Sequence, residues 1–149
     1  MNIYNYVISN KKAKPTFVLP IIFFMCKRIL VVEDDYDIIC VLTDLLNDEG
    51  YEVVGLNYTA SIVESVRESR PDLVILDFLL PGINGGEHCL ELKANPEFSG
   101  VPVILMSGFP RFPESFGDFG SDGFIEKPFD VNAILHLVEC CLAGRHELV

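Results

Sequence analysis

The sequence predicts an α/β fold in which a parallel β-sheet is covered by helices on both faces. Short apolar segments alternate with segments of helical periodicity from residue 27 to residue 143, a pattern typical of strands joined by crossover helices. The chain has 149 residues, of which 50% are hydrophobic and 11% aromatic. This length suits one domain, and this apolar content is enough for one well-filled core.

Three strands and two helices are predicted in the first half of the chain. The first strand is a continuous apolar run, as expected where both faces of a strand are buried. Apolar residues at helical spacing follow it, and Gly50 stands where a helix commonly ends. The second helix ends before Pro71, because the residue before a proline disfavours helical backbone. The expected elements are strands over 28–32, 51–56 and 72–77, and helices over 35–49 and 59–70.

The second half of the chain is predicted to hold two strands and a less regular set of helices. A turn rich in glycine and proline leads into a helix through Ala94. Residues 108–123 contain Pro110 and Pro113 among several glycines, and a proline lacks an amide hydrogen and clashes with the preceding turn. The fourth helix is therefore predicted to be short or irregular. Asp130 is expected to cap the last helix. Strands are expected over 101–106 and 124–126, and the last helix over 130–143.

Three stretches of the chain are expected to differ in role. Residues 27–143 form the predicted domain, and residues 144–149 a C-terminal tail. Residues 1–26 form an N-terminal extension of uncertain status, in which three lysines precede an apolar run over 17–26. That run is shorter than the ~20 apolar residues that span a bilayer, so no membrane contact is expected. Met25 is an alternative start, because the sequence runs from it directly into the first strand.

Charge and cysteine usage argue against several functions. The net charge of −11 and the pI of about 4.5 predict a surface that repels nucleic-acid phosphates, so no direct nucleic acid binding is expected. The five cysteines form no C-x-x-C pair and the three histidines do not cluster, so neither a zinc site nor a disulfide framework is indicated. Reduced, buried thiols in a cytoplasmic protein are expected instead.

Polar side chains are found where the predicted strands end. They are Glu33, Asp34 and Asp35 after the first strand, Asp77 at the end of the third, Ser107 after the fourth and Lys127 after the fifth. Ligands of open α/β sheets bind beyond the carboxyl ends of the strands. Clustered carboxylates repel one another unless a cation lies among them, and oxygen ligands suit Mg²⁺. A carboxylate can accept a phosphoryl group as an acyl phosphate, and a nearby hydroxyl and ammonium would stabilise its charge.

Four segments resemble the receiver domain of bacterial response regulators: V-V-E-D-D, L-V-I-L-D-F-L-L-P-G-I-N-G, V-I-L-M-S-G and F-I-E-K-P-F. They occur in the family's order, each at a predicted strand end, and the resemblance covers residues 27–142. It implies a flavodoxin-like three-layer sandwich with a five-stranded parallel sheet in the order 2-1-3-4-5. It also implies a two-component signalling role, in which a histidine kinase or phosphotransfer protein passes a phosphoryl group to the domain.

The resemblance assigns a phosphoacceptor and a metal site. Asp77 matches the aspartate that is phosphorylated. Asp34, Asp77 and the backbone carbonyl of Leu79 match the direct ligands of Mg²⁺, with Mn²⁺ as an alternative ion. Glu33 stands where the family usually has Asp, and the resemblance implies that it acts on the metal through water.

The resemblance also assigns the groups that bind the phosphoryl group and change conformation. Ser107 matches the hydroxyl that moves to the phosphoryl oxygens, and Lys127 matches the lysine that pairs with them. Phe124 takes the place of the aromatic switch residue. The Lys127–Pro128 peptide bond is expected to be cis. Asp35 is expected to begin the first helix rather than to bind metal.

Residues 108–123 depart from the family, which has a regular fourth helix there. The stretch carries four phenylalanines: Phe109, Phe112, Phe116 and Phe119. Their rings either fill the sheet face in place of helix side chains or form an exposed patch that docks a partner. Leu79 and Phe109 are both apolar at two positions that, in the family, influence how long the phosphoryl group survives. Slow self-dephosphorylation is therefore predicted.

The resulting prediction is a stand-alone receiver domain that switches its contact with an unknown downstream protein. It is expected not to be an enzyme, beyond accepting and slowly losing its own phosphoryl group. Whether it forms a homodimer is left open by the sequence. The main alternative is a receiver-like interaction module that works without phosphorylation. A phosphatase using an aspartyl phosphate would need a second Asp where Leu79 stands. A flavin-binding flavodoxin would need a hydroxyl-rich loop where Glu33 and Asp34 stand.

Overall fold

The computed structural model describes residues 26–144, so residues 1–25 of the N-terminal extension, Met25 among them, and most of the C-terminal tail lie outside the described residues. Five parallel strands form one sheet in the order β2-β1-β3-β4-β5, which confirms the predicted topology. Their bounds are β1 Arg28–Val32, β2 Glu52–Leu56, β3 Leu73–Asp77, β4 Val103–Ser107 and β5 Gly123–Glu126. The interior strands β3 and β4 are buried along their whole length, because helices cover both faces of the sheet.

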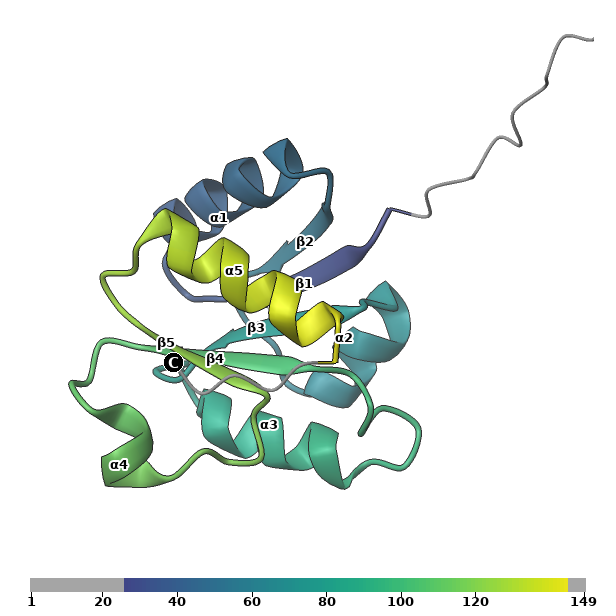
Figure 1. Ribbon diagram of the computed structural model, residues 1–149. Helices are drawn as coiled ribbons and strands as arrows, with labels where there is room; N and C mark the ends of the chain where they lie inside the picture. Colours follow the sequence, from purple (N-terminus) through teal and green to yellow (C-terminus); the bar gives the residue numbers. More distant parts are fainter. Residues whose placement is uncertain (1–25, 145–149) are drawn as a thin grey trace, which may run out of the picture.

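Helices α1 and α5 cover one face of the sheet, and α2 and α3 cover the other (Figure 1). Each face has its own apolar core. Leu42 of α1 and Ile134 of α5 pack on one side, while Val66 of α2 and Leu92 of α3 pack on the other. The helix bounds are α1 Tyr36–Asp48, α2 Ile62–Ser69, α3 Gly85–Ala94, α4 Phe112–Phe116 and α5 Val131–Leu142.

Two predicted helix starts are confirmed by their caps. Asp35 Oδ1 accepts a hydrogen bond of 2.9 Å from the amide of Asp37, so Asp35 begins α1. Asp130 Oδ1 accepts 2.8 Å and 3.1 Å bonds from the first free amides of α5. These carboxylates satisfy amides that have no partner within the helix.

Some predicted boundaries were wrong by two or three residues. The second helix begins at Ile62 instead of residue 59, because the Ser61 hydroxyl caps it. The fourth strand begins at Val103 instead of residue 101, because Pro102 has no amide to donate to a neighbouring strand. The strand then continues through Ser107, one residue further than predicted.

The fourth helix, α4, is short, as the prolines and glycines predicted. It has five residues and no side-chain cap at its start, and Arg111 before it has a φ of 53°. The phenylalanine rings divide between buried positions, as the first alternative predicts, and exposed positions, as the second requires, and docking of a partner stays a prediction. Phe112 is fully buried and Phe119 is partly buried, whereas Phe109 and Phe116 are 38% and 51% exposed.

The expectation of buried thiols was only partly right. Cys89, Cys140 and Cys141 are buried, but Cys26 is exposed and Cys40 is half-buried. Cys26 lies two residues before β1, where its thiol is 2.7 Å from the carbonyl of Gly50. All five are free thiols. Within residues 26–144, the longest helices are too short or too polar to cross a membrane.

Candidate functional site

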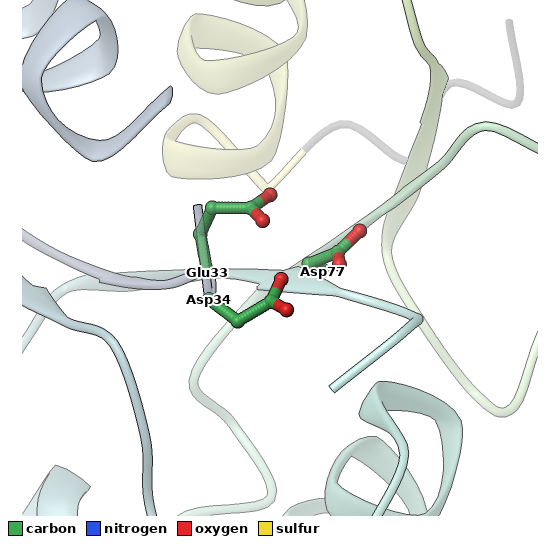
Figure 2. Close-up of side chains that lie close together, drawn as sticks. All are labelled: Glu33, Asp34 and Asp77. Carbon is green, nitrogen blue, oxygen red and sulfur yellow. The ribbon is translucent and has the colours of Figure 1, made fainter. Parts of the chain in front are cut away.

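Three carboxylates meet at the carboxyl ends of β1 and β3. Val32 is paired with Leu76 across these neighbouring strands, so Glu33 and Asp77 leave the sheet at the same level. One carboxylate oxygen from each of Glu33, Asp34 and Asp77 lies within 4.8 Å of the others, and Figure 2 shows the three groups gathered in one place. Glu33 and Asp77 are buried, whereas Asp34 is exposed and leaves the cluster open to solvent.

Lys127 supplies the positive charge of this site from the loop after β5. Its Nζ atom is 2.5 Å from Glu33 Oε2 and 2.8 Å from Asp77 Oδ1. Burial opposes the charge of the ammonium, but the hydrogen bonds to Asp77 and Glu33 outweigh this cost and raise the pKa of Lys127 above its ordinary value. One cation therefore bridges the two buried carboxylates.

Ser107 is positioned by backbone contacts of β4. The carbonyl of Met106 accepts a 2.8 Å bond from the amide of Phe78, which holds the end of β4 beside Asp77. The carbonyl of Ser107 accepts another 2.8 Å bond from the amide of Lys127. Ser107 is 1% exposed, and its hydroxyl oxygen accepts a 3.1 Å bond from the amide of Phe109. The peptide bond between Lys127 and the next residue, Pro128, is cis.

The other two predicted site residues, Leu79 and Phe124, lie outside the carboxylate cluster. Leu79 is in the loop after β3 with 56% of its surface exposed. Phe124 points away from solvent, with 8% exposed, and its ring stacks on Phe112 at a centroid distance of 5.1 Å and an angle of 9°. The structure therefore brings Glu33, Asp34 and Asp77 together, with Lys127 among them, and places Phe124 in an aromatic cluster.

The sequence analysis did not identify Phe78 as a member of that aromatic cluster. Phe78 follows Asp77 directly and its ring lies within 6.4 Å of the rings of all four phenylalanines in residues 108–123. An apolar residue directly after a strand usually serves packing, so Phe78 does not stand out in the sequence. The unusual number of phenylalanines nearby was the available signal.

The donor set fits a hard divalent cation. Carboxylate oxygens are the ligands that Mg²⁺ prefers, and their separation allows one ion to contact more than one of them. The exposed Asp34 leaves room for water and for a phosphoryl group. This fold and site define the class of α/β domain that carries an acidic cluster suited to a divalent cation at the carboxyl ends of its strands.

The comparisons with known proteins agree with this class. The family model described as response regulator receiver domain matches residues 29–139. A curated relative, the DNA-binding response regulator MtrA of Mycolicibacterium paratuberculosis, is 39% identical over 107 residues, which are 70% of this chain and 46% of the relative. The chain thus spans about half the length of the curated relatives it matches first.

Solved structures show the same similarity. A putative response regulator from Chloroflexus aurantiacus matches with a TM-score of 0.71 and 27% identity, covering 79% of this chain and 98% of that one. The response regulator TrrA of Thermotoga maritima, solved in complex with Mg²⁺ and BeF, matches with a TM-score of 0.68 and 28% identity, covering 76% and 96%. The chain belongs to the response regulator receiver domain family.

Proposed function

We propose that residues 27–143 accept a phosphoryl group onto Asp77 from the phosphohistidine of a histidine kinase or phosphotransfer protein. The observation that carries this proposal is the 2.8 Å contact between Lys127 Nζ and Asp77 Oδ1 inside the acidic cluster. A carboxylate nucleophile beside a fixed ammonium suits phosphoryl acceptance, because the ammonium stabilises the charge on the transferred group.

In the proposed step, a carboxylate oxygen of Asp77 attacks phosphorus. The O–P bond forms while the P–N bond of the phosphohistidine breaks, and its electron pair returns to the imidazole nitrogen. Lys127 then pairs with one phosphoryl oxygen, and the Ser107 hydroxyl donates to another. Lys127 already contacts Asp77, so little reorganisation is needed on its side.

The metal site of this proposal uses the same cluster. Asp34, Asp77 and the backbone carbonyl of Leu79 would hold Mg²⁺ directly, or Mn²⁺ in its place, and Glu33 would act through water. When bound, the ion neutralises charge on the phosphoryl oxygens. Glu33 already accepts hydrogen bonds from Lys127 and from a backbone amide two residues on, which supports an indirect role for Glu33.

The proposed output is a change in a protein–protein interaction. MtrA is named as a DNA-binding regulator, but the matched stretch covers less than half of it. For residues 27–143 we propose no direct nucleic acid contact, since the chain carries a net charge of −11. The downstream partner is therefore expected to be a protein, and a second copy of the chain is one candidate.

The test is the intact-protein mass after incubation with Mg²⁺ and acetyl phosphate. We expect a gain of one phosphoryl group in the wild type. The gain should be absent without Mg²⁺ and absent in Asp77→Asn and Asp77→Ala. The matched control is Asp72→Asn, which should keep the mass gain. Asp72 pairs with Lys27 at the amino ends of the strands, the end of the sheet opposite to the acidic cluster.

Absence of a mass gain under every condition would overturn the proposal. The receiver-like interaction module without phosphorylation would then be the better account. A gain that persists in Asp77→Asn would place the phosphoryl group elsewhere in the chain.

A further inference from the structure

We propose that Phe78, rather than Phe124, couples the phosphorylation state of Asp77 to residues 108–122. The coupling runs through the ring cluster, defined here as Phe78, Phe109, Phe112, Phe116, Phe119 and Phe124. This inference rests on the proposed function, because it takes Asp77 as the phosphoacceptor. It concerns a step that the acidic cluster alone does not explain: how a change at Asp77 reaches the surface.

Phe78 is the first residue after Asp77, so the two share a peptide bond. Its ring is 4.3 Å from that of Phe112 and 5.7 Å from that of Phe119, between ring centroids. The rings of Phe116 and Phe109 follow at 5.9 Å and 6.4 Å. Because packed rings cannot shift independently, a displacement of the backbone after Asp77 is passed to the whole segment.

The segment depends on these rings for its conformation. Arg111 and Phe119 both have a φ of 53°, a left-handed conformation that is unfavourable for bulky side chains. The ring of Phe119 lies directly on Gly86 of α3, where a Cβ atom would be 2.8 Å from its Cδ1 atom. Ring packing therefore holds a strained backbone in place, which makes residues 108–122 sensitive to the position of Phe78.

A hydrogen bond ties the other end of the segment to the site. The hydroxyl oxygen of Ser107 accepts from the amide of Phe109 at 3.1 Å. If Ser107 turns its hydroxyl toward a phosphoryl group on Asp77, this bond is lengthened or reoriented. The start of the segment would then be released while Phe78 moves its middle.

Phe124 is less suited to be the primary coupling residue. It is 8% exposed and stacks nearly parallel on Phe112. Phe112 itself is fully buried between Phe124 and Phe78. Because Phe124 packs on Phe112 and Phe112 packs on Phe78, the proposal places Phe124 downstream of Phe78 in this cluster.

Two rings of the ring cluster are exposed to solvent. Phe109 and Phe116 are 38% and 51% exposed, with 5.7 Å between their centroids. A change in their positions alters the apolar surface that the segment presents to solvent. Phe116 is therefore the place for a reporter.

The chain has no tryptophan, so Phe116→Trp introduces a single tryptophan, whose emission can be excited selectively over that of the five tyrosines. We expect its emission maximum to shift when acetyl phosphate and Mg²⁺ are added, in parallel with the mass gain. The shift should be absent when Asp77→Asn is added to the reporter chain. A second substitution, Phe78→Leu, should abolish the shift while the mass gain is retained. Phe124→Leu should leave a shift, because Phe78 and Phe112 remain.

The matched control for Phe78→Leu is Phe98→Leu, a partly buried ring that lies outside the ring cluster. This variant should keep the shift. Phe78→Met replaces Phe78→Leu if the latter does not fold, as judged by urea unfolding. A mass gain with unchanged emission, or a shift that survives in both Phe78 variants, would overturn the coupling alone. No mass gain in the parent chain would overturn the proposed function, and the coupling with it.

Discussion

At the scale of single residues, Lys127 balances the charge of the site. Its ammonium contacts both buried carboxylates, and Glu33 is 1% exposed. Lys127→Met should lower the free energy of unfolding by about 3 kcal/mol, because removing one partner leaves buried charge without compensation. Mg²⁺ should restore part of this loss, since a second cation then neutralises the cluster. Urea unfolding with and without Mg²⁺ measures both effects.

The control for this prediction is Lys27→Met. Lys27 pairs with Asp72 at 3.1 Å, but the two side chains are 56% and 36% exposed. Surface ion pairs of this kind contribute at most about 1 kcal/mol. Equal losses in the two lysine variants, or a Mg²⁺ effect of the same size in both, would contradict the role assigned to Lys127.

Leu79 should limit the loss of the phosphoryl group. Its apolar side chain lies two residues after Asp77 and is largely exposed, so it cannot orient an attacking water. We expect a phosphoryl lifetime of minutes or longer in the wild type. Leu79→Asn should shorten it roughly tenfold, which corresponds to about 1.4 kcal/mol in the barrier. The decay of the phosphorylated mass over time measures this, and Val131→Asn, at a similarly exposed apolar position on α5, is the control. A wild-type lifetime of seconds would refute the prediction.

At the scale of elements, α3 is held against the end of β3 by a glycine. A Cβ atom at Gly85 would overlap the carbonyl of Asp77 and come within 3.0 Å of Phe78 Cα. Gly85→Ala should therefore destabilise the fold by about 1–3 kcal/mol, because the backbone cannot yield as a flexible side chain could. It should also slow phosphorylation, since Asp77 is displaced. Gly100→Ala meets nothing within 4 Å and should change neither property.

Helix α3 also carries a buried histidine that should make stability depend on pH. His88 is 1% exposed, and its Nδ1 is 3.8 Å from Glu91 Oε2, too far for a hydrogen bond. Burial outweighs the opposing effect of the Glu91 carboxylate and lowers the pKa of His88 below its usual 6.5. As pH falls below 6.5, the unfolded chain takes up a proton that the folded chain does not. Stability should therefore be fully present above this value and decrease below it, by at most about 1.4 kcal/mol per pH unit.

Urea unfolding between neutral and mildly acidic pH tests the role of His88. His88→Met should flatten this part of the pH dependence, because no imidazole is left to be protonated. The control is His136→Gln, at an exposed position of α5. If His136→Gln flattens the curve as much as His88→Met does, the buried imidazole is not the cause.

At the scale of the whole molecule, the net charge of −11 opposes folding through self-repulsion. NaCl should stabilise the chain modestly by screening this charge. MgCl₂ at the same ionic strength should stabilise it further, by about 2.7 kcal/mol at a hundred times the dissociation constant. Asp34→Asn should keep the effect of NaCl and lose the extra effect of MgCl₂. Equal effects of the two salts in the wild type would argue against a specific site.

Much of the fold could be predicted because each signal is local. The run at Arg28–Val32 is apolar at every position after Arg28, and its predicted bounds agree with β1. Asp35 and Asp130 were predictable as caps, because a carboxylate before an apolar helical pattern has a direct local role. The boundaries that failed, at Ile62 and Val103, are set by the single residue before each element, and the apolar pattern used to predict the segments does not show them. Ser61 caps the helix, and Pro102 has no amide to donate to a neighbouring strand.

The sequence by itself determined the alternation of strands and helices, the short fourth helix and the polar residues at the strand ends. These follow from periodicity, proline and the direction that parallel strands share. Only the tertiary structure decided that one ammonium bridges Glu33 and Asp77, that Phe78 meets four rings from residues 108–123, and that His88 is buried. These contacts join residues far apart in the chain, and their distances depend on how the layers pack.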